Sequence, residues 1–252
     1  MSRTKIEWTE ATWQPVTGCT AVSDGCDHCY AKRIIETRLR GRHGYDAEDP
    51  FRPTARWDRL KQPFQWKKPR MIFVSSMGDL FHNTIPMDFL QEVFRTIEMN
   101  RQHIYQLLTK RPARMVAAME IYKSSNRMDD EEFRLTFGNV WWGVSIEHWK
   151  YLSRLEFLRL IPTFCRFVSF EPLLSMMPSL DLRGIHWAIL GCESGSDRRR
   201  CDQTWMVDLV NECHSQETAV FVKQIDLAGS VCRDFQQFPP ALQFREYPEA
   251  VR

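Results

Sequence analysis

The run Gly18-Cys-Thr-Ala-Val-Ser-Asp-Gly-Cys-Asp-His-Cys-Tyr-Ala31 places three cysteines, Cys19, Cys26 and Cys29, in one short segment. Three thiolates in one loop can hold three irons of a cubic [4Fe-4S] cluster and leave the fourth iron open to a small molecule. The loop follows a strand-like stretch, Trp13 to Thr17, and leads into a helix-like one. The segment therefore predicts an iron-sulfur site with one open iron at the carboxyl end of a strand.

Two other uses of these cysteines stay open. Zinc in a structural site takes four ligands, and His28 or His43 could complete a Cys3His set, although no second C-x2-C pair follows. A disulfide framework is less favoured, because the chain opens MSRTKIEWTE without an apolar signal segment and its 252 residues can build a core without cross-links. We expect a reducing, cytoplasmic setting, in which the scattered Cys165 and Cys213 are small buried hydrophobes.

The composition is that of an ordinary globular protein, with 43% hydrophobic and 26% charged residues and a net charge of +2. No apolar run is long enough to span a membrane, so no membrane partner is expected. Basic residues are clustered, and such clusters are either solvated faces or contacts to a phosphate backbone. They occur at Lys32-Arg33, Arg38 to His43, Lys67 to Arg70 and Arg198 to Arg200.

Short apolar, β-rich runs recur along the chain without alternating polar residues, which is typical of strands buried on both faces in a parallel sheet. After Trp13 to Thr17 they are Met71 to Ser75, His103 to Leu108, Val140 to Ser145, Arg166 to Phe170, His186 to Leu190 and Ala219 to Lys223.

Stretches with helical period separate these runs. They follow Pro86 and Pro112, cover Trp149 to Ile161, and follow Asp202. Repeated strand-helix units predict an α/β fold, and a (β/α) barrel, partial or complete, fits better than an open sheet because no Gly-rich dinucleotide turn occurs. We expect a single domain over residues 1–252, with insertions at about 42–69 and 124–139 and a C-terminal extension at about 227–252.

Polar side chains follow each predicted strand directly. In a barrel all strand ends meet at one mouth, so these residues should line one site. The set comprises Ser75, Ser76, Gly78 and Asp79; Thr109, Lys110 and Arg111; Ser145 and Glu147; Glu171; Cys192 and Glu193; and Lys223 and Gln224.

These motifs resemble the phage and prophage three-cysteine family of radical-SAM-like proteins, long catalogued as a domain of unknown function. The resemblance covers about residue 6 to about residue 226. It rests on the cysteine run with the preceding Trp13-Gln-Pro-Val-Thr17, and on Leu107 to Arg111, Gly143 to Glu147, Ser169 to Leu174, Gly191 to Gly195 and Phe221 to Gln224. Two departures stand out: the superfamily spacing C-x3-C-x2-C is here C-x6-C-x2-C, and Cys192 replaces a glycine.

The resemblance implies a radical S-adenosylmethionine (SAM) enzyme with a [4Fe-4S] cluster on Cys19, Cys26 and Cys29. Electron donation to the cluster would cleave SAM to methionine and a 5′-deoxyadenosyl radical, which abstracts hydrogen from a substrate. On this basis the amine of SAM would contact Ser75, Ser76, Gly78 and Asp79, and its carboxylate would contact Lys110 or Arg111. The ribose would contact Ser145 and Glu147, and Thr109 and Glu171 would complete the cofactor site. The catalytic residues would be Glu193, Lys223 and Cys192.

The substrate and net reaction are not given by the sequence. The resemblance implies a phage setting, in which a modified nucleotide or hypermodified thymidine in DNA is a reasonable substrate and an isomerase, lyase or other modification reaction is possible. A flavodoxin or ferredoxin would donate the electron. The alternative is a non-enzymatic module, in which a cluster or a zinc ion braces a surface that binds nucleic acid or a protein partner.

Overall fold

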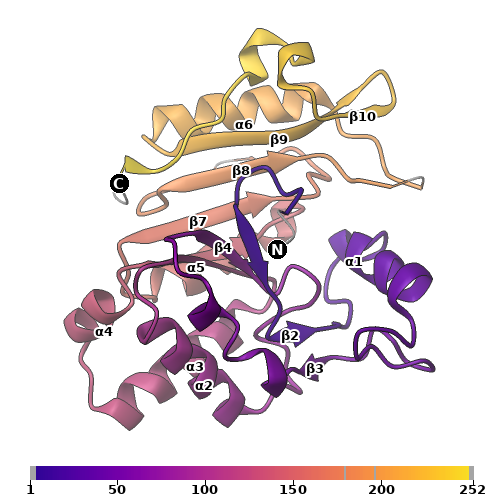
Figure 1. Ribbon diagram of the computed structural model, residues 1–252. Coiled ribbons are helices and arrows are strands. Elements are labelled where there is room, and N and C mark those ends of the chain that lie inside the picture. Colours follow the sequence, from indigo (N-terminus) through magenta and orange to yellow (C-terminus); the bar gives the residue numbers. More distant parts are fainter. Residues whose placement is uncertain (1–3, 179, 196, 250–252) are drawn as a thin grey trace.

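The computed structural model describes residues 4–178, 180–195 and 197–249, and its centre is an eight-stranded sheet (Figure 1). The order of strands in the sheet follows the sequence, and every neighbouring pair is parallel except β10, which runs antiparallel to β9. The strands are β1 (Ala11–Trp13), β4 (Met71–Val74), β5 (Ile104–Thr109), β6 (Val140–Ser145), β7 (Cys165–Phe170), β8 (Trp187–Gly191), β9 (Ala219–Leu227) and β10 (Ser230–Cys232). This arrangement confirms the α/β class.

Helices connect successive strands and cover the outer face of the sheet. They are α2 (Met87–Glu98), α3 (Pro112–Asn126), α4 (Asp130–Thr136), α5 (Arg154–Arg159) and α6 (Gln203–Ser215), while α1 (Tyr30–Ile34) stands apart from the others in Figure 1. A π-helical turn, η2 (Ile35–Leu39), continues α1, and short 3-10 turns occur at Asp24–Cys26, Trp57–Arg59, Pro63–Gln65, Trp149–Tyr151, Phe235–Gln237 and Pro240–Leu242. No helix among the described residues has the length and apolarity needed to cross a membrane.

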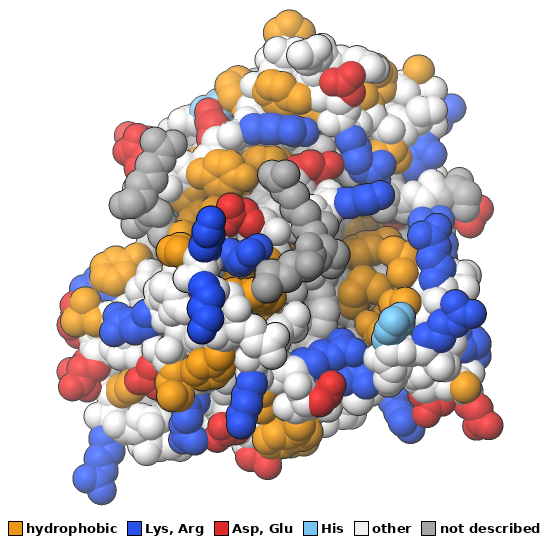
Figure 2. Space-filling model, viewed as in Figure 1, with side chains coloured by type: hydrophobic (Ala, Val, Ile, Leu, Met, Phe, Trp, Pro, Cys, Tyr) orange, Lys and Arg blue, Asp and Glu red, His pale blue; other side chains and the backbone are white. Residues whose placement is uncertain are grey.

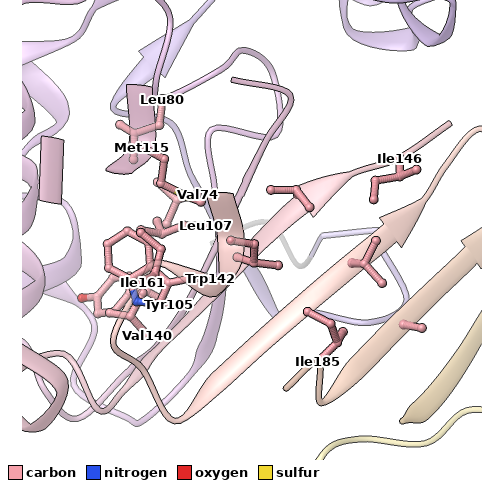
Figure 3. Close-up of a cluster of buried hydrophobic side chains, with 14 of the residues drawn as sticks. Val74, Leu80, Tyr105, Leu107, Met115, Val140, Trp142, Ile146, Ile161 and Ile185 are labelled. Atoms are coloured by element: carbon pink, nitrogen blue, oxygen red, sulfur yellow. The ribbon is translucent and has the colours of Figure 1, made fainter. Parts of the chain in front are cut away.

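The main core lies between the sheet and the helices. Val74, Leu107 and Trp142, from three adjacent strands, are buried there with Met115 of α3 (Figure 3). The expected helical stripe after Pro86 is also buried in this layer. Burial of each such side chain contributes about 1.5 to 3 kcal/mol, so this layer fixes the position of every strand end.

A second, aromatic cluster fills the other face of the sheet, and it shows that the sheet is strongly curved. The Trp8 ring lies 4.6 Å from the Phe73 ring on β4 and 6.0 Å from the Trp187 ring on β8. In a flat sheet these strands, four positions apart, would be separated by about 19 Å. One indole reaches both because the sheet bends around it.

Closure into a barrel is not confirmed. Among the described residues no ladder joins β10 to β1, and the outer edge of β9 is covered by β10 and by the C-terminal segment. The amide of Val222 donates to the Phe244 carbonyl at 2.9 Å, and the amide of Glu246 donates to the Val220 carbonyl at 2.8 Å. Because the chain's own tail occupies this edge, β9 cannot pair with β1.

The first predicted strand, Trp13 to Thr17, is divided in the structure. β1 ends at Trp13, and β2 (Val16–Thr17) pairs instead with β3 (Thr54–Ala55) in a separate two-stranded ladder. Pro15 lies between them and has no amide hydrogen for a ladder. The prediction was correct in placing a strand before the cysteine loop and wrong in its extent.

The segment 124–139, expected to be an insertion, is mostly exposed but contributes Phe133 and Phe137 to the core. It contains the end of α3 and the whole of α4, whose Phe133 ring lies 5.9 Å from the Trp142 ring of β6. Asp129 and Glu132 form a reciprocal capping box at the start of α4. The pattern Asp-x-x-Glu before Phe133 is a known helix-start signal that could have predicted this helix. The segment 42–69 contains β3 and two 3-10 turns, with no longer element.

Candidate metal and ligand site

A cavity of about 880 Å³ opens at the carboxyl ends of the parallel strands, bounded on one side by the cysteine loop and α1. Figure 2 shows it as a hollow beside α1 with hydrophobic side chains inside. All the site residues expected from the sequence line it except Glu147: Cys19, Cys26, Cys29, Ser75, Ser76, Gly78, Asp79, Thr109, Lys110, Arg111, Ser145, Glu171, Cys192, Glu193, Lys223 and Gln224. The strand ends therefore converge without closure of a barrel.

The cysteine loop begins at Gly18, whose amide donates to the Met77 carbonyl at 2.9 Å in the segment after β4. Gly18 has a φ of +77°, and a Cβ there would lie 2.3 Å from the Arg52 carbonyl oxygen, so only glycine fits. The loop then turns through a 3-10 segment up to Cys26, and Cys29 caps the start of α1. The thiols of Cys19, Cys26 and Cys29 are free and half-buried at the cavity wall.

The first anchor of the loop is an ion pair between Arg111 and Asp79, at the ends of β5 and β4. Arg111 Nη1 lies 2.9 Å from Asp79 Oδ2 and 3.3 Å from Cys19 Sγ, and Nη2 donates to the Thr20 carbonyl at 2.8 Å. Thr109 Oγ1 donates to the other Asp79 oxygen at 2.7 Å. Burial and then the Asp79 charge raise the pKa of Cys19 to about 11, against the lowering effect of Arg111.

The second anchor is Glu147, which is fully buried behind the loop and does not line the cavity. Its carboxylate is bound by Lys110 Nζ at 2.8 Å and by Arg154 Nη1 at 2.6 Å, and it accepts a hydrogen bond from Ser23. Burial would raise the pKa of Glu147, but the two cations and these hydrogen bonds hold it below its usual value. The geometry contradicts the expected contact between Glu147 and a ribose, because the carboxylate is occupied by groups of this chain.

Lys110 also faces a cysteine. Its Nζ lies 3.9 Å from Cys26 Sγ. Burial would raise the pKa of Cys26, but the Lys110 charge and hydrogen bonds from the Val22 backbone and from Ser23 lower it on balance. The Lys110 charge therefore favours the thiolate form of Cys26, the form that binds metals, whereas at Cys19 burial outweighs the nearby Arg111 charge.

The third anchor is Glu193, at the end of β8, which the sequence had suggested as a catalytic group. It is buried and accepts from His28 Nδ1 at 3.0 Å, from the Arg199 amide at 2.7 Å and from two side-chain nitrogens of Arg199. Arg199 also donates to the Asp24 carbonyl at 2.8 Å and to Asp27 Oδ2 at 3.2 Å. Glu193 therefore holds the cysteine loop, and Arg199 is not a free surface cation for DNA.

The cavity wall at the end of β7 and along β9 carries a further ion pair. Lys223 Nζ lies 2.9 Å from Glu171 Oε1, and Ser169 donates to the other oxygen at 3.2 Å. Cys192 lies in this part of the lining but is almost completely buried, and burial raises the pKa of its thiol to about 12. Its neutral thiol packs there as a small apolar group.

Ser75 carries a polar group in the lining that no other described residue satisfies. Its Oγ is buried and has no hydrogen-bond partner within the described residues, and its φ of +59° is unusual for a non-glycine residue. Ser76, next in the chain, accepts a hydrogen bond from Gln14 Nε2 at 2.5 Å. An unsatisfied hydroxyl in a cavity wall is a position at which a ligand would gain a hydrogen bond.

The described residues contain no group of three or more His, Cys, Asp or Glu side chains gathered closely enough to hold one metal ion. A cubic cluster has a different requirement, since it takes one thiolate on each of three irons. Three thiols spread around one side of a cavity, with cations beside two of them, fit that requirement. His43, one of the alternative zinc ligands, is exposed and outside the cavity lining, whereas His28 lines the cavity.

A family model described as "Protein of unknown function (DUF5131)" matches residues 3–236. The chain belongs to this DUF5131 family. No curated protein sequence matches it. Among solved structures, a double mutant of spore photoproduct lyase with bound AdoMet and dinucleoside spore photoproduct is similar to the DUF5131 chain, with a TM-score of 0.47 and 12% sequence identity over 89% of this chain and 69% of the lyase.

The residues that sequence reasoning missed are the partners of the buried carboxylates. Arg154 and Arg199 lie a few residues after the carboxylates that they bind and carry no motif that assigns them to this contact. Ser23 lies in the cysteine loop, far in the sequence from its partner Glu147. A cluster of three arginines at 198–200 could have indicated a buried anchor, but clusters of this kind are more often solvated.

Proposed function

We propose that this chain is a radical SAM enzyme in which Cys19, Cys26 and Cys29 hold a [4Fe-4S] cluster and SAM binds beside it in the cavity. The observation that carries the proposal is the position of the three thiols. They border a cavity at the carboxyl ends of parallel strands, where polar side chains from six strands meet. The donors would be the three soft thiolates of the loop, because the fourth cysteine of the lining, Cys192, is almost completely buried. One iron of the cluster would therefore have no protein ligand.

The chain's own residues supply the rest of the site. Ser75, with Ser76 and Gly78, would accept the amine of SAM, and Ser145 would contact the ribose. Lys110 would meet the carboxylate of SAM while keeping its ion pair with Glu147. Arg111 is engaged by Asp79, Thr20 and Cys19. Because Arg111 contacts both Asp79 and Cys19, Arg111 and Asp79 are positioning residues for Cys19.

The Glu171–Lys223 pair and Cys192 lie on the side of the cavity left to the substrate. When bound, the reduced cluster supplies one electron that cleaves SAM to methionine and a 5′-deoxyadenosyl radical able to remove hydrogen from an unactivated C–H bond. The half-enclosed lining would limit access of water to the reacting groups. A flavodoxin or ferredoxin is the proposed electron donor, and a phage-encoded nucleotide modification is the proposed setting.

The experiment is anaerobic purification and reconstitution, followed by iron and sulfide analysis, electron paramagnetic resonance after dithionite reduction, and detection of 5′-deoxyadenosine from SAM. Single replacement of Cys19, Cys26 or Cys29 by Ala should abolish the cluster signal. The matched controls, Cys165→Ala and Cys213→Ala, remove buried thiols outside the cavity lining and should retain it. Colourless protein with stoichiometric zinc would instead support a metal-braced binding module, and iron that survives Cys19→Ala would refute the three-thiolate site.

A further inference from the structure

Four cations line the cavity without an ion pair among the described residues. They come from four separate parts of the chain: Lys5 from the N-terminal segment, Arg33 from α1, Arg198 from the loop after β8, and Arg233 from the segment after β10. Lysine and arginine side chains surround the hollow beside α1 in Figure 2. Convergence of unpaired cations from four segments on one opening favours an anionic ligand.

The acidic side chains of the lining do not neutralise them. Asp79, Glu171 and Glu193 are each bound already, by Arg111, Lys223 and Arg199. Among the described residues Glu7 is the remaining acidic residue of the lining, against four cations. The opening therefore carries an excess of positive charge that a ligand with a single carboxylate would not match.

Arg198 adds a donor that lacks an acceptor. Its Nε is buried and makes no hydrogen bond within the described residues, although the side chain as a whole is half-buried in the cavity wall. Buried donors are nearly always satisfied. The planar guanidinium group matches the oxygens of a phosphate better than an ammonium group does.

Aromatic rings lie in the same lining. Tyr30, which directly follows Cys29 and is 39% exposed, lines the cavity together with Phe51, Trp8 and Phe73. The Tyr30 hydroxyl donates to the Ser76 carbonyl at 2.6 Å, which fixes the ring against the wall. Aromatic rings combined with a basic groove are the means by which proteins hold unpaired nucleobases.

We infer that the substrate of the proposed reaction is a nucleotide, with phosphate held by Lys5, Arg33, Arg198 and Arg233 and the base directed into the cavity. The inference rests on the proposed function for the reaction, but the binding it requires can be measured without turnover. The nucleotide can be free or part of a strand. In a strand it would have to be unstacked to enter, so a single strand should bind better than a duplex.

The test measures anisotropy of a labelled single-stranded oligothymidylate, on the order of 12 nucleotides long, with the reconstituted protein. Four phosphate contacts predict a slope of about −2.8 for log affinity against log salt, or an affinity loss of about 50-fold between about 50 and 200 mM salt. The double variant Arg33→Gln/Arg233→Gln should reduce the slope to about −1.4 and the loss to about 7-fold. The control, Arg95→Gln/Arg183→Gln, removes two exposed arginines outside the lining and should leave the slope unchanged.

Competitors identify the ligand. If thymidine 5′-monophosphate displaces the labelled oligonucleotide, a free nucleotide is sufficient for binding. If only unlabelled single-stranded DNA displaces it, the site binds a nucleotide within a strand. The inference is overturned if polyglutamate displaces the labelled oligonucleotide as effectively as unlabelled oligonucleotide does. It is also overturned if the double variant has the same slope of log affinity against log salt as the wild type. Iron content and SAM binding are measured on the same samples. If the protein holds iron and binds SAM but does not bind the oligonucleotide, the nucleotide substrate is rejected and the proposed reaction is not. If it binds the oligonucleotide but holds no iron, the proposed reaction is rejected and nucleotide binding is not.

Discussion

Gly25 lies directly against Glu147, so that a Cβ built on Gly25 would be 2.2 Å from Glu147 Cγ. The two residues are 122 positions apart, one in the middle of the cysteine loop and the other at the end of β6. Absence of a side chain at Gly25 lets the loop contact the buried carboxylate. The cysteines are thus placed by close packing onto the strand end as well as by ion pairs.

The substitution Gly25→Ala should therefore displace the cysteine loop. A 2.2 Å approach to Cγ, which is not the far end of the side chain, requires movement of the loop or of Glu147. We expect reconstituted Gly25→Ala to hold much less iron than the wild type while its far-UV circular dichroism is unchanged. Gly138→Ala is the control, because a Cβ there meets its nearest neighbour at 3.4 Å. Full iron content in Gly25→Ala would show that the loop does not need this contact.

Glu147→Gln should destabilise the fold strongly. It removes the charge between Lys110 and Arg154 and leaves two cations close together in a buried site. Loss of one member of a buried ionic cluster costs about 3 kcal/mol or more, to be measured by urea unfolding. Glu120→Gln breaks an exposed pair with Lys123 and should change stability by no more than about 0.5 kcal/mol. Equal effects of the two substitutions would contradict the anchoring role of Glu147.

The same carboxylate predicts a pH dependence. The pKa of Glu147 is held below its ordinary value of 4.5 in the folded chain. Its stabilising contribution is therefore complete above pH 4.5 and is lost as the pH falls through the lower, folded-state pKa. The difference in unfolding free energy between wild type and Glu147→Gln should be constant near neutral pH and shrink below pH 4.5. A difference that grows on acidification would have the wrong sign.

The strand ends could be predicted from sequence because each polar group directly follows an uninterrupted apolar run. Parallel pairing then requires that these ends meet, which is why Ser75, Lys110, Glu171 and Lys223 were all expected at one site and line one cavity. Periodicity and turn chemistry, both local, were sufficient for that conclusion.

Roles within the site could not be predicted in the same way. Whether a buried glutamate faces a ligand or a cation of its own chain depends on how the next few residues fold back, as with Glu147 and Arg154 or Glu193 and Arg199. It also depends on contacts between distant segments, as with Glu147 and Ser23. That the sheet does not pair β9 with β1 has the same origin, since pairing of the C-terminal tail at Phe244 with β9 carries no local signal. The sequence thus predicted which residues line the cavity but not which groups of the chain they contact.

Arg199→Lys should loosen the cysteine loop without unfolding the protein. A lysine cannot keep the two-pronged contact to Glu193 together with the bonds to Asp24 and Asp27. Loss of one charge-assisted hydrogen bond costs about 1.5 kcal/mol, which corresponds to roughly tenfold faster iron release to a chelator. Arg200→Lys changes the exposed neighbour and should release iron at the wild-type rate. Identical release from both variants would remove Arg199 from the set of loop anchors.

Ser75→Ala separates ligand binding from folding. The Ser75 hydroxyl is buried without a partner in the described structure, so its removal should leave stability unchanged or raise it slightly. If this hydroxyl bonds SAM, calorimetric titration of the reconstituted variant should show affinity weaker by about 0.5 to 1.5 kcal/mol, or roughly 2- to 12-fold. Tyr105→Phe is the matched control, because its hydroxyl is also buried without a partner but lies in the core outside the cavity lining. Tyr105→Phe should not weaken SAM binding, and a variant Ser75→Ala with wild-type affinity would place the SAM amine elsewhere on the cavity wall.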